Sequence, residues 1–191
     1  MLHNVKFETQ TANFNQKGSQ GIKMIKFSPF MANCIASAGM DGSVFVWDIN
    51  TRQPSATFLS NHSSRVNAVS FSSHNPVLMC SAGLDQNVNF YDIRDRKYFV
   101  IVVILALFLS HRVVKTLSTD APLTALAFHN DGHTIAVGTL YGGLYIYDLK
   151  SSGSPKLLLA GHDSQINFVD FVRPEQKESS KVVYSSRIRG L

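Results

Sequence analysis

A six-residue pattern occurs four times along this chain of 191 residues, and it constrains the fold more than any other feature. Each copy carries apolar residues at its first, fourth and sixth positions and closes on phenylalanine. The closing phenylalanines lie about 44, 57 and 43 residues apart. A period of about 40–45 residues is typical of chains built from repeated supersecondary units, each of which buries its apolar face against the next. The four copies are Ile22–Phe27, Val66–Phe71, Leu123–Phe128 and Ile166–Phe171.

A second landmark, an aromatic residue followed by aspartate, comes after each of the first three copies. Ahead of the first landmark, Asp41-Gly42 is a pair that tolerates positive φ and closes a tight hairpin. The next strand, Val44–Trp47, is apolar on both faces, as suits a strand with sheet packed on either side. A generic antiparallel meander explains the turns but not a shared register at a fixed period. The landmarks are Trp47-Asp48, Tyr91-Asp92 and Tyr147-Asp148.

With these features the chain resembles the WD-repeat family. The resemblance implies an all-β fold, a partial WD40 β-propeller of about three and a half four-stranded blades whose ring is not closed. We expect residues 1–17 to be an N-terminal strand or linker remnant, and residues 172–191 to be a polar tail with one strand near Val182–Tyr184. The expected blades cover residues 18–60, 61–118 and 119–160, and a fourth begins at residue 161.

The resemblance also implies a structural network of side chains. In the family, a repeat can carry His before its first strand, Ser or Thr on the second, Asp in the turn and Trp on the third. Such a buried, satisfied network stiffens a blade and catalyses nothing. Its expected members are His62, Ser81, Asp85 and Tyr91 in the second copy, Ser37, Asp41 and Trp47 in the first, and His162 in the fourth. The pattern fails at Gly18, which replaces the first His, and at Thr119, Val137 and Tyr141 in the third copy.

The chain holds three repeats and the start of a fourth, whereas propellers close rings of about four to eight blades. Half a ring leaves an apolar blade face and a strand edge open. We therefore expect the chain to be a fragment or truncated product of a longer protein, and to associate or misfold when alone.

One interval is too long because of an apolar insertion at residues 98–112. Its run Tyr98–Leu109 would reach about 18 Å as a helix, against roughly 30 Å of bilayer hydrocarbon, so we expect no membrane span. Removing the insertion restores the period and joins a normal outer strand, Val113–Leu117, to the basic loop before it. We hypothesise that the fold does not need this segment, which could be a translated intron. The alternatives are an elongated outer hairpin and a membrane-attached product.

No site chemistry stands out. The net charge of +5 is spread along the chain without a dense basic stripe, so we expect no nucleic-acid partner. His129 and His133 flank a turn and lack further ligands for zinc. Residues 161–164 hold hydrolase residue types without the strand–turn–helix that a nucleophile needs. Residues 138–143 are glycine-rich but lack the Lys-Ser/Thr of a phosphate loop. We expect no catalytic, cofactor or metal site.

Two further groups of residues carry expectations. Cys34 and Cys80 lie in apolar stretches, which indicates buried, reduced thiols. The short basic loop with Arg94, Arg96 and Lys97 is a solvated connector or a contact for an acidic partner.

The amino-acid sequence of the later repeats indicates a narrower family than the repeat pattern does. The stretches Lys115–Leu117, Asp120–Phe128, Ile135–Gly138 and Tyr145–Leu149 resemble the NEDD-type family of centrosomal WD-repeat adaptors, which target the gamma-tubulin ring complex. The resemblance covers about residues 18–171 without the insertion. It implies a non-enzymatic, cytoplasmic adaptor with protein partners at centrosomes, spindles or other microtubule-organising sites, and no membrane. The alternative is a generic WD40 scaffold such as a ubiquitin-ligase substrate receptor.

Overall fold

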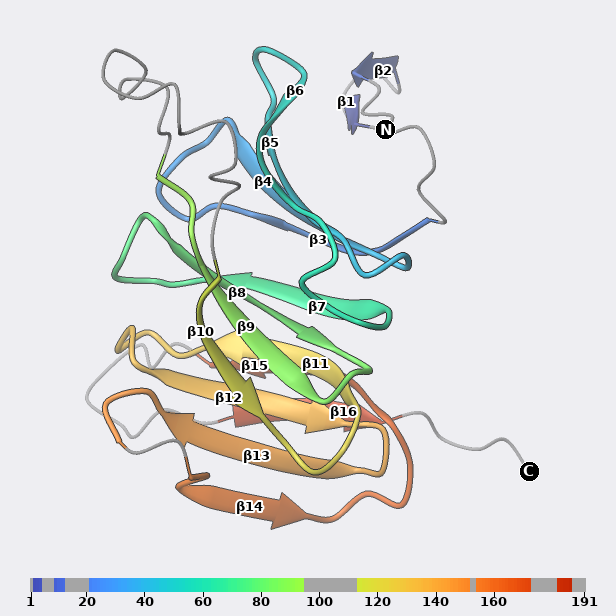
Figure 1. Ribbon diagram of the computed structural model, residues 1–191, viewed down its shortest axis with the longest axis vertical. Helices are drawn as coiled ribbons and strands as arrows, with labels where there is room; N and C mark the ends of the chain where they lie inside the picture. The colour runs from blue at the N-terminus through green and yellow to red at the C-terminus, as the bar shows by residue number, and fades with distance from the viewer. Residues whose placement is uncertain are drawn as a thin grey trace.

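Every regular element of the computed structural model is a β-strand in the residues that it describes (Figure 1). Gly18, Arg96, Lys97 and the insertion at 98–112 lie outside those residues. The described ranges are 2–4, 9–12, 21–94, 113–151, 154–172 and 182–186.

Three four-stranded antiparallel sheets follow one another along the described chain, and the strands of each sheet pair in sequence order. The first sheet contains β3 (Ile22–Phe27), β4 (Cys34–Gly39), β5 (Val44–Asp48) and β6 (Gln53–Phe58). The second contains β7 (Val66–Phe71), β8 (Leu78–Gly83), β9 (Asn87–Asp92) and β10 (Val113–Ser118). The third contains β11 (Leu123–Phe128), β12 (Thr134–Thr139), β13 (Gly143–Asp148) and β14 (Leu157–Ala160).

Two smaller sheets complete the described residues. β15 (Ile166–Phe171) pairs with β16 (Val182–Ser186), and β1 (Leu2–Asn4) pairs with β2 (Thr9–Ala12). The four sheets that begin with β3, β7, β11 and β15 follow the four copies of the repeat. They form no closed ring among the described residues, which confirms the expected all-β fold of a partial WD40 propeller.

Neighbouring sheets are joined in the same way each time. The first strand of each sheet contacts the first and second strands of the sheet before it: β7 contacts β3 and β4, β11 contacts β7 and β8, and β15 contacts β11 and β12. Small side chains on the earlier sheet, such as Ala36 and Ala38, pack with larger ones on the later sheet, such as Val69 and Phe71. Burial of these apolar faces therefore lies between sheets, which makes each sheet depend on its neighbours.

The first strand of all four sheets carries a bulge at the same place. Its pairing register shifts between the first and third residues, for example between Val66 and Ala68, or between Leu123 and Ala125. A bulge re-aims the side chain that it leaves unpaired. The second residue of each strand, polar in all four, is therefore distinguished from its neighbours: Lys23, Asn67, Thr124 and Asn167.

The aromatic–aspartate landmark closes the third strand of each complete sheet. The Asp48, Asp92 and Asp148 carboxylates each accept a hydrogen bond from the backbone N–H two residues on, at 2.8, 3.0 and 3.0 Å. Such an Asx turn reverses the chain toward the fourth strand. The third and fourth strands are connected by residues 49–52 in the first sheet and by residues 149–156 in the third. In the second sheet the connection is longer and comprises residues 93–112.

Candidate functional site

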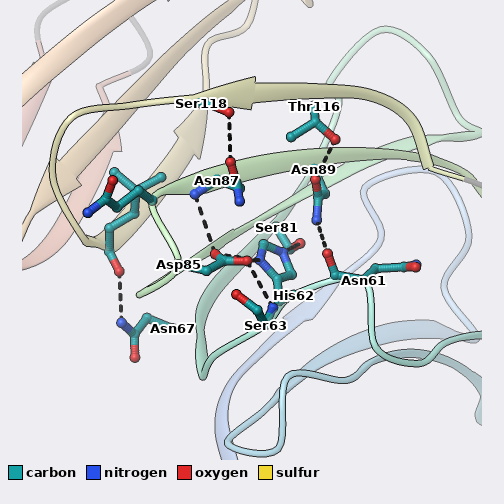
Figure 2. A network of polar contacts seen from close by, with 12 residues as sticks. Asn61, His62, Ser63, Asn67, Ser81, Asp85, Asn87, Asn89, Thr116 and Ser118 are labelled. Carbon is teal, nitrogen blue, oxygen red and sulfur yellow. Dashed lines mark hydrogen bonds and ion pairs between the residues drawn. The ribbon is translucent and has the colours of Figure 1, made fainter.

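Four side chains predicted for the second copy come together in one buried chain of hydrogen bonds, part of which is drawn in Figure 2. His62 Nδ1 lies 2.8 and 3.0 Å from the two carboxylate oxygens of Asp85, in the turn before β9. His62 Nε2 lies 2.6 Å from Ser81 Oγ on β8, and that oxygen lies 2.8 Å from Tyr91 Oη on β9. Tyr91 thus takes the place that Trp has in the family. These contacts tie the segment before β7 to β8, to the turn before β9 and to β9 itself. They also give partners to polar groups that would otherwise be buried without any.

Local structure holds this chain in place. The Asp85 carboxylate also accepts the backbone N–H of Ser63 at 3.1 Å, next to His62. Gly83 at the end of β8 leaves room for the imidazole, because a Cβ there would lie 2.7 Å from His62 Nδ1. The Tyr91 ring packs on Phe58 of the preceding sheet, with ring centroids 4.2 Å apart. The network therefore stiffens one sheet and also supports its junction with the sheet before it.

The series Ser81–His62–Asp85 has the residue types of a hydrolytic triad, but its geometry serves structure. Ser81 and Tyr91 have no solvent exposure, so no substrate can approach the serine oxygen. The Tyr91 hydroxyl occupies a hydrogen-bonding position on that oxygen, and burial raises the pKa of the phenol well above its ordinary value. A nucleophilic serine needs space for the carbonyl that it attacks and for an oxyanion. Neither is present here.

The other predicted members are only partly connected. In the first sheet Trp47 Nε1 donates to Ser37 Oγ at 2.9 Å, while the Asp41 carboxylate accepts the backbone N–H of Ser43 at 3.0 Å. Among the described residues these two hydrogen bonds share no side chain. In the fourth sheet the His162 ring stands edge-on to Tyr184 of β16, with ring centroids 4.9 Å apart.

The third sheet replaces the network with a shorter one. Val137 stands at the serine position, and Tyr141 in the aspartate place is exposed. Thr139 occupies the place of Gly83, and its hydroxyl donates to the Gly143 carbonyl at 3.0 Å and accepts the Gly143 N–H at 2.9 Å. Thr119, in the histidine place, donates its hydroxyl to the carbonyls of Gln86 and Ala121 at 2.9 Å. Without a histidine to accommodate, a side chain fits where the second sheet needs glycine.

The bulged positions supply contacts between sheets that the sequence interpretation missed. Asn67 Nδ2 donates to the Leu123 carbonyl of the next sheet at 2.8 Å, and Thr124 Oγ1 donates to the Ile166 carbonyl at 2.6 Å. In both cases the second residue of one first strand bonds the first residue of the next. The signal was available, because this position is polar in all four copies of the repeat.

The first strands also border a cavity of about 280 Å³. Its lining includes the four bulged residues and Gln165, so polar and basic groups face it together with apolar ones. The cavity holds no constellation suited to catalysis. Its position between the first strands corresponds to the axis around which blades are arranged.

The remaining predicted groups lie apart from the network. Arg94 is exposed and its guanidinium pairs with Asp92, with Nε 2.8 Å from Oδ2. Cys34 and Cys80 are free thiols in the core. His129 and His133 both contact the Asp131 carboxylate, yet no group of described residues is arranged to hold a metal ion. Within the described part of the chain no helix is long and apolar enough to cross a bilayer.

The family follows from a comparison with known domains. The family described as nucleolar protein 10-like, N-terminal domain, a β-propeller family, matches residues 22–190. The chain belongs to this family. It is also homologous to the protein NEDD1, with 32% identity to the proteins of Bos taurus and Mus musculus and 30% to that of Homo sapiens, each over 90% of this chain. This confirms the resemblance inferred from the repeats. The chain spans about a quarter of the length of these relatives, 24% in each case.

A solved structure shows the same fold at lower identity. One chain in the crystal structure of the mitotic checkpoint complex matches with a TM-score of 0.69 and 19% identity, over 88% of this chain and 45% of that one. The geometry and the family together describe a WD-repeat scaffold, in which buried side chains tie sheets together.

Proposed function

We propose that the chain acts as a WD-repeat adaptor that binds protein partners at centrosomes, spindles or other microtubule-organising sites in the cytoplasm. The observation that carries the proposal is the 30–32% identity to NEDD1 over 90% of the chain. By the resemblance described above, the partners are centrosomal proteins or components of gamma-tubulin complexes.

The structure supports a binding role because hydrogen bonds between buried polar side chains make its sheets rigid. The His62–Ser81–Tyr91 contacts are sealed inside one sheet, and Asn67 and Thr124 bond one sheet to the next. Rigid sheets hold their connecting loops in fixed places, and loops on a rigid scaffold are where recognition residues concentrate. Such a rigid scaffold presents surfaces to protein partners.

We propose the basic loop that begins at Arg94 as one contact surface, with Arg96 and Lys97 as its further members. Arg94 is exposed at the end of β9, where Asp92 fixes the turn. The matched position in the third sheet is Lys150, whose backbone N–H donates to Asp148 in the same way at 3.0 Å. An exposed cation on a fixed turn suits an acidic partner.

Imaging in dividing cells tests the localisation. The 191-residue chain and a version lacking residues 98–112 carry the same fluorescent tag and are imaged with a gamma-tubulin marker. Foci that coincide with the marker support the adaptor function, and we expect them to be brighter for the version without the apolar insertion. Diffuse fluorescence from both versions, with the folded state verified by circular dichroism of the purified chains, would refute the proposal. Enrichment of ubiquitin-ligase subunits with the tagged chain, in place of centrosomal proteins, would favour the substrate-receptor function.

A pair of variants tests the basic loop. Arg94→Ala is expected to reduce the intensity of the foci, because it removes the exposed charge and leaves the Asx turn of Asp92 intact. Lys150→Ala is the matched control and should leave the foci unchanged. Equal intensity for both variants would show that the loop is only a solvated connector.

A further inference from the structure

Among the residues that the structure describes, the first strand of the first sheet is not covered by another sheet as its counterparts are. Ile22, Ile25 and Phe27 of β3 are 50–53% exposed. The residues at the same positions of β7 and β11 are at most 8% exposed, because each of those strands packs on the sheet before it. The β3 face is therefore one half of a sheet-to-sheet junction, made of the same residue types as the occupied ones.

The other half lies at the far end of the described chain. A junction uses the first and second strands of the earlier sheet, and the fourth sheet consists of those two strands, β15 and β16. On them Phe168 and Val183 are 47% and 50% exposed. By register, Val183 stands where the complete sheets have the buried residues Ala36, Cys80 and Ala136.

The hydrogen bonds between sheets point to the same pairing. Asn67 and Thr124 each donate to the carbonyl of the first residue in the next first strand. Asn167 is the corresponding residue of β15; it is exposed, and its side chain makes no hydrogen bond within the described residues. The Ile22 carbonyl at the start of β3 is the corresponding acceptor at the other end.

We propose that two copies of the chain join into one ring, in which β3 of each copy packs onto β15 and β16 of the other and Asn167 donates to the Ile22 carbonyl of the second copy. A two-fold axis along the central cavity makes both junctions identical, so association stops at two copies. The resulting eight sheets lie within the about four to eight blades of known propellers.

Two observations favour a second copy as the occupant. Both open faces belong to this chain and are the two sides of a junction that it already forms three times. In addition, the matched chain of the mitotic checkpoint complex structure is covered to 45%, so two copies correspond to almost its whole length. The second copy also completes the cavity between the first strands, where Lys23 of each copy lies beside Asn167 of the other. This association does not depend on the proposed centrosomal function.

Light scattering after gel filtration tests the stoichiometry on the full 191-residue chain. We expect a mass of twice the 21.1 kDa of one chain, unchanged over a hundredfold range of concentration above the dissociation constant. Ile25→Lys should lower this mass to that of the monomer, because it places a charge in both junctions. Val114→Lys, an exposed apolar residue on the outer strand β10, is the matched control and should remain dimeric. A monomeric wild-type chain, or a mass that grows without limit as in an open filament, would overturn the proposal.

Cross-linking keeps the proposal testable if Ile25→Lys does not fold. Chains carrying Lys23→Cys are mixed with chains carrying Asn167→Cys and treated with a short bismaleimide. The proposed ring predicts a covalent dimer in the mixture and none with either variant alone. A product from Lys23→Cys alone would show that the β3 faces meet each other, and absence of any product would show that the ends do not meet. The native Cys34 and Cys80 are buried and should give little background.

Discussion

Removing the hydroxyl at the centre of the second sheet's network should cost more than removing its counterpart in the first sheet. Ser81 Oγ contacts both His62 Nε2 and Tyr91 Oη, so Ser81→Ala removes a hydrogen-bond partner from two buried groups. Leaving His62 Nε2 unsatisfied costs about 1–3 kcal/mol and losing one bond of Tyr91 about 1 kcal/mol more, which predicts a loss of about 3 kcal/mol in the free energy of unfolding. Within the described part of the chain Ser37 has one such partner, Trp47 Nε1, so Ser37→Ala should cost about 1–2 kcal/mol.

Urea unfolding followed by far-UV circular dichroism measures both variants at one fixed protein concentration, because association of subunits contributes to the apparent stability. A double-mutant cycle compares Ser81→Ala, Tyr91→Phe and the double variant Ser81→Ala/Tyr91→Phe. Removing the tyrosine hydroxyl should be less costly by about 1 kcal/mol when Ser81 is already absent, since the hydroxyl has then lost its hydrogen bond with Ser81. Equal losses for Ser81→Ala and Ser37→Ala, with additive effects in the cycle, would refute a connected network.

Further outcomes follow from other parts of the structure. Deleting residues 98–112 leaves a five-residue connection between β9 and β10, comparable to those in the first and third sheets, so we expect an unchanged or higher urea midpoint and less light scattering at 340 nm; a lower midpoint would show that the insertion supports the fold. Burial raises the pKa of the Cys34 thiol to about 11 and that of Cys80 well above its ordinary value, so a thiol reagent at pH 8 should count no reactive cysteine in the native chain and two after denaturation. Gly42→Ala should lower the free energy of unfolding by at least about 1 kcal/mol, because φ is +84° and the added Cβ would lie 2.7 Å from a carbonyl oxygen, whereas Gly161→Ala, with its nearest contact at 3.7 Å, should change little.

The repeat pattern predicted the fold because it reports on burial between sheets. The apolar positions of Val66, Val69 and Phe71 had to face another sheet, and in the structure they do. The aromatic–aspartate landmark was equally informative, since the Asp48 carboxylate has a local task in the turn that follows it. Residues whose roles are set within one sheet or by its neighbour recur at the same positions of each repeat, so the sequence reveals them.

Contacts that depend on the absence of a residue were harder to anticipate. The loss of histidine from the third sheet was evident at Thr119, but the compensating contact of Thr139 with Gly143 was not. It follows from the space that a missing imidazole releases, which no spacing rule encodes. The donors Asn67 and Thr124 were missed because a polar residue beside an apolar strand is commonly taken to face solvent.

Sequential pairing of strands bears on how the chain acquires its structure during synthesis. In every described sheet each strand bonds the one made immediately before or after it, so a sheet can form as soon as its last strand leaves the ribosome. The stretch between β9 and β10 delays the second sheet only modestly, because the entropy of closing a loop grows slowly with its length. During that delay a nascent polypeptide would expose twelve consecutive apolar residues, from Tyr98 to Leu109, which is where chaperones would be expected to engage it.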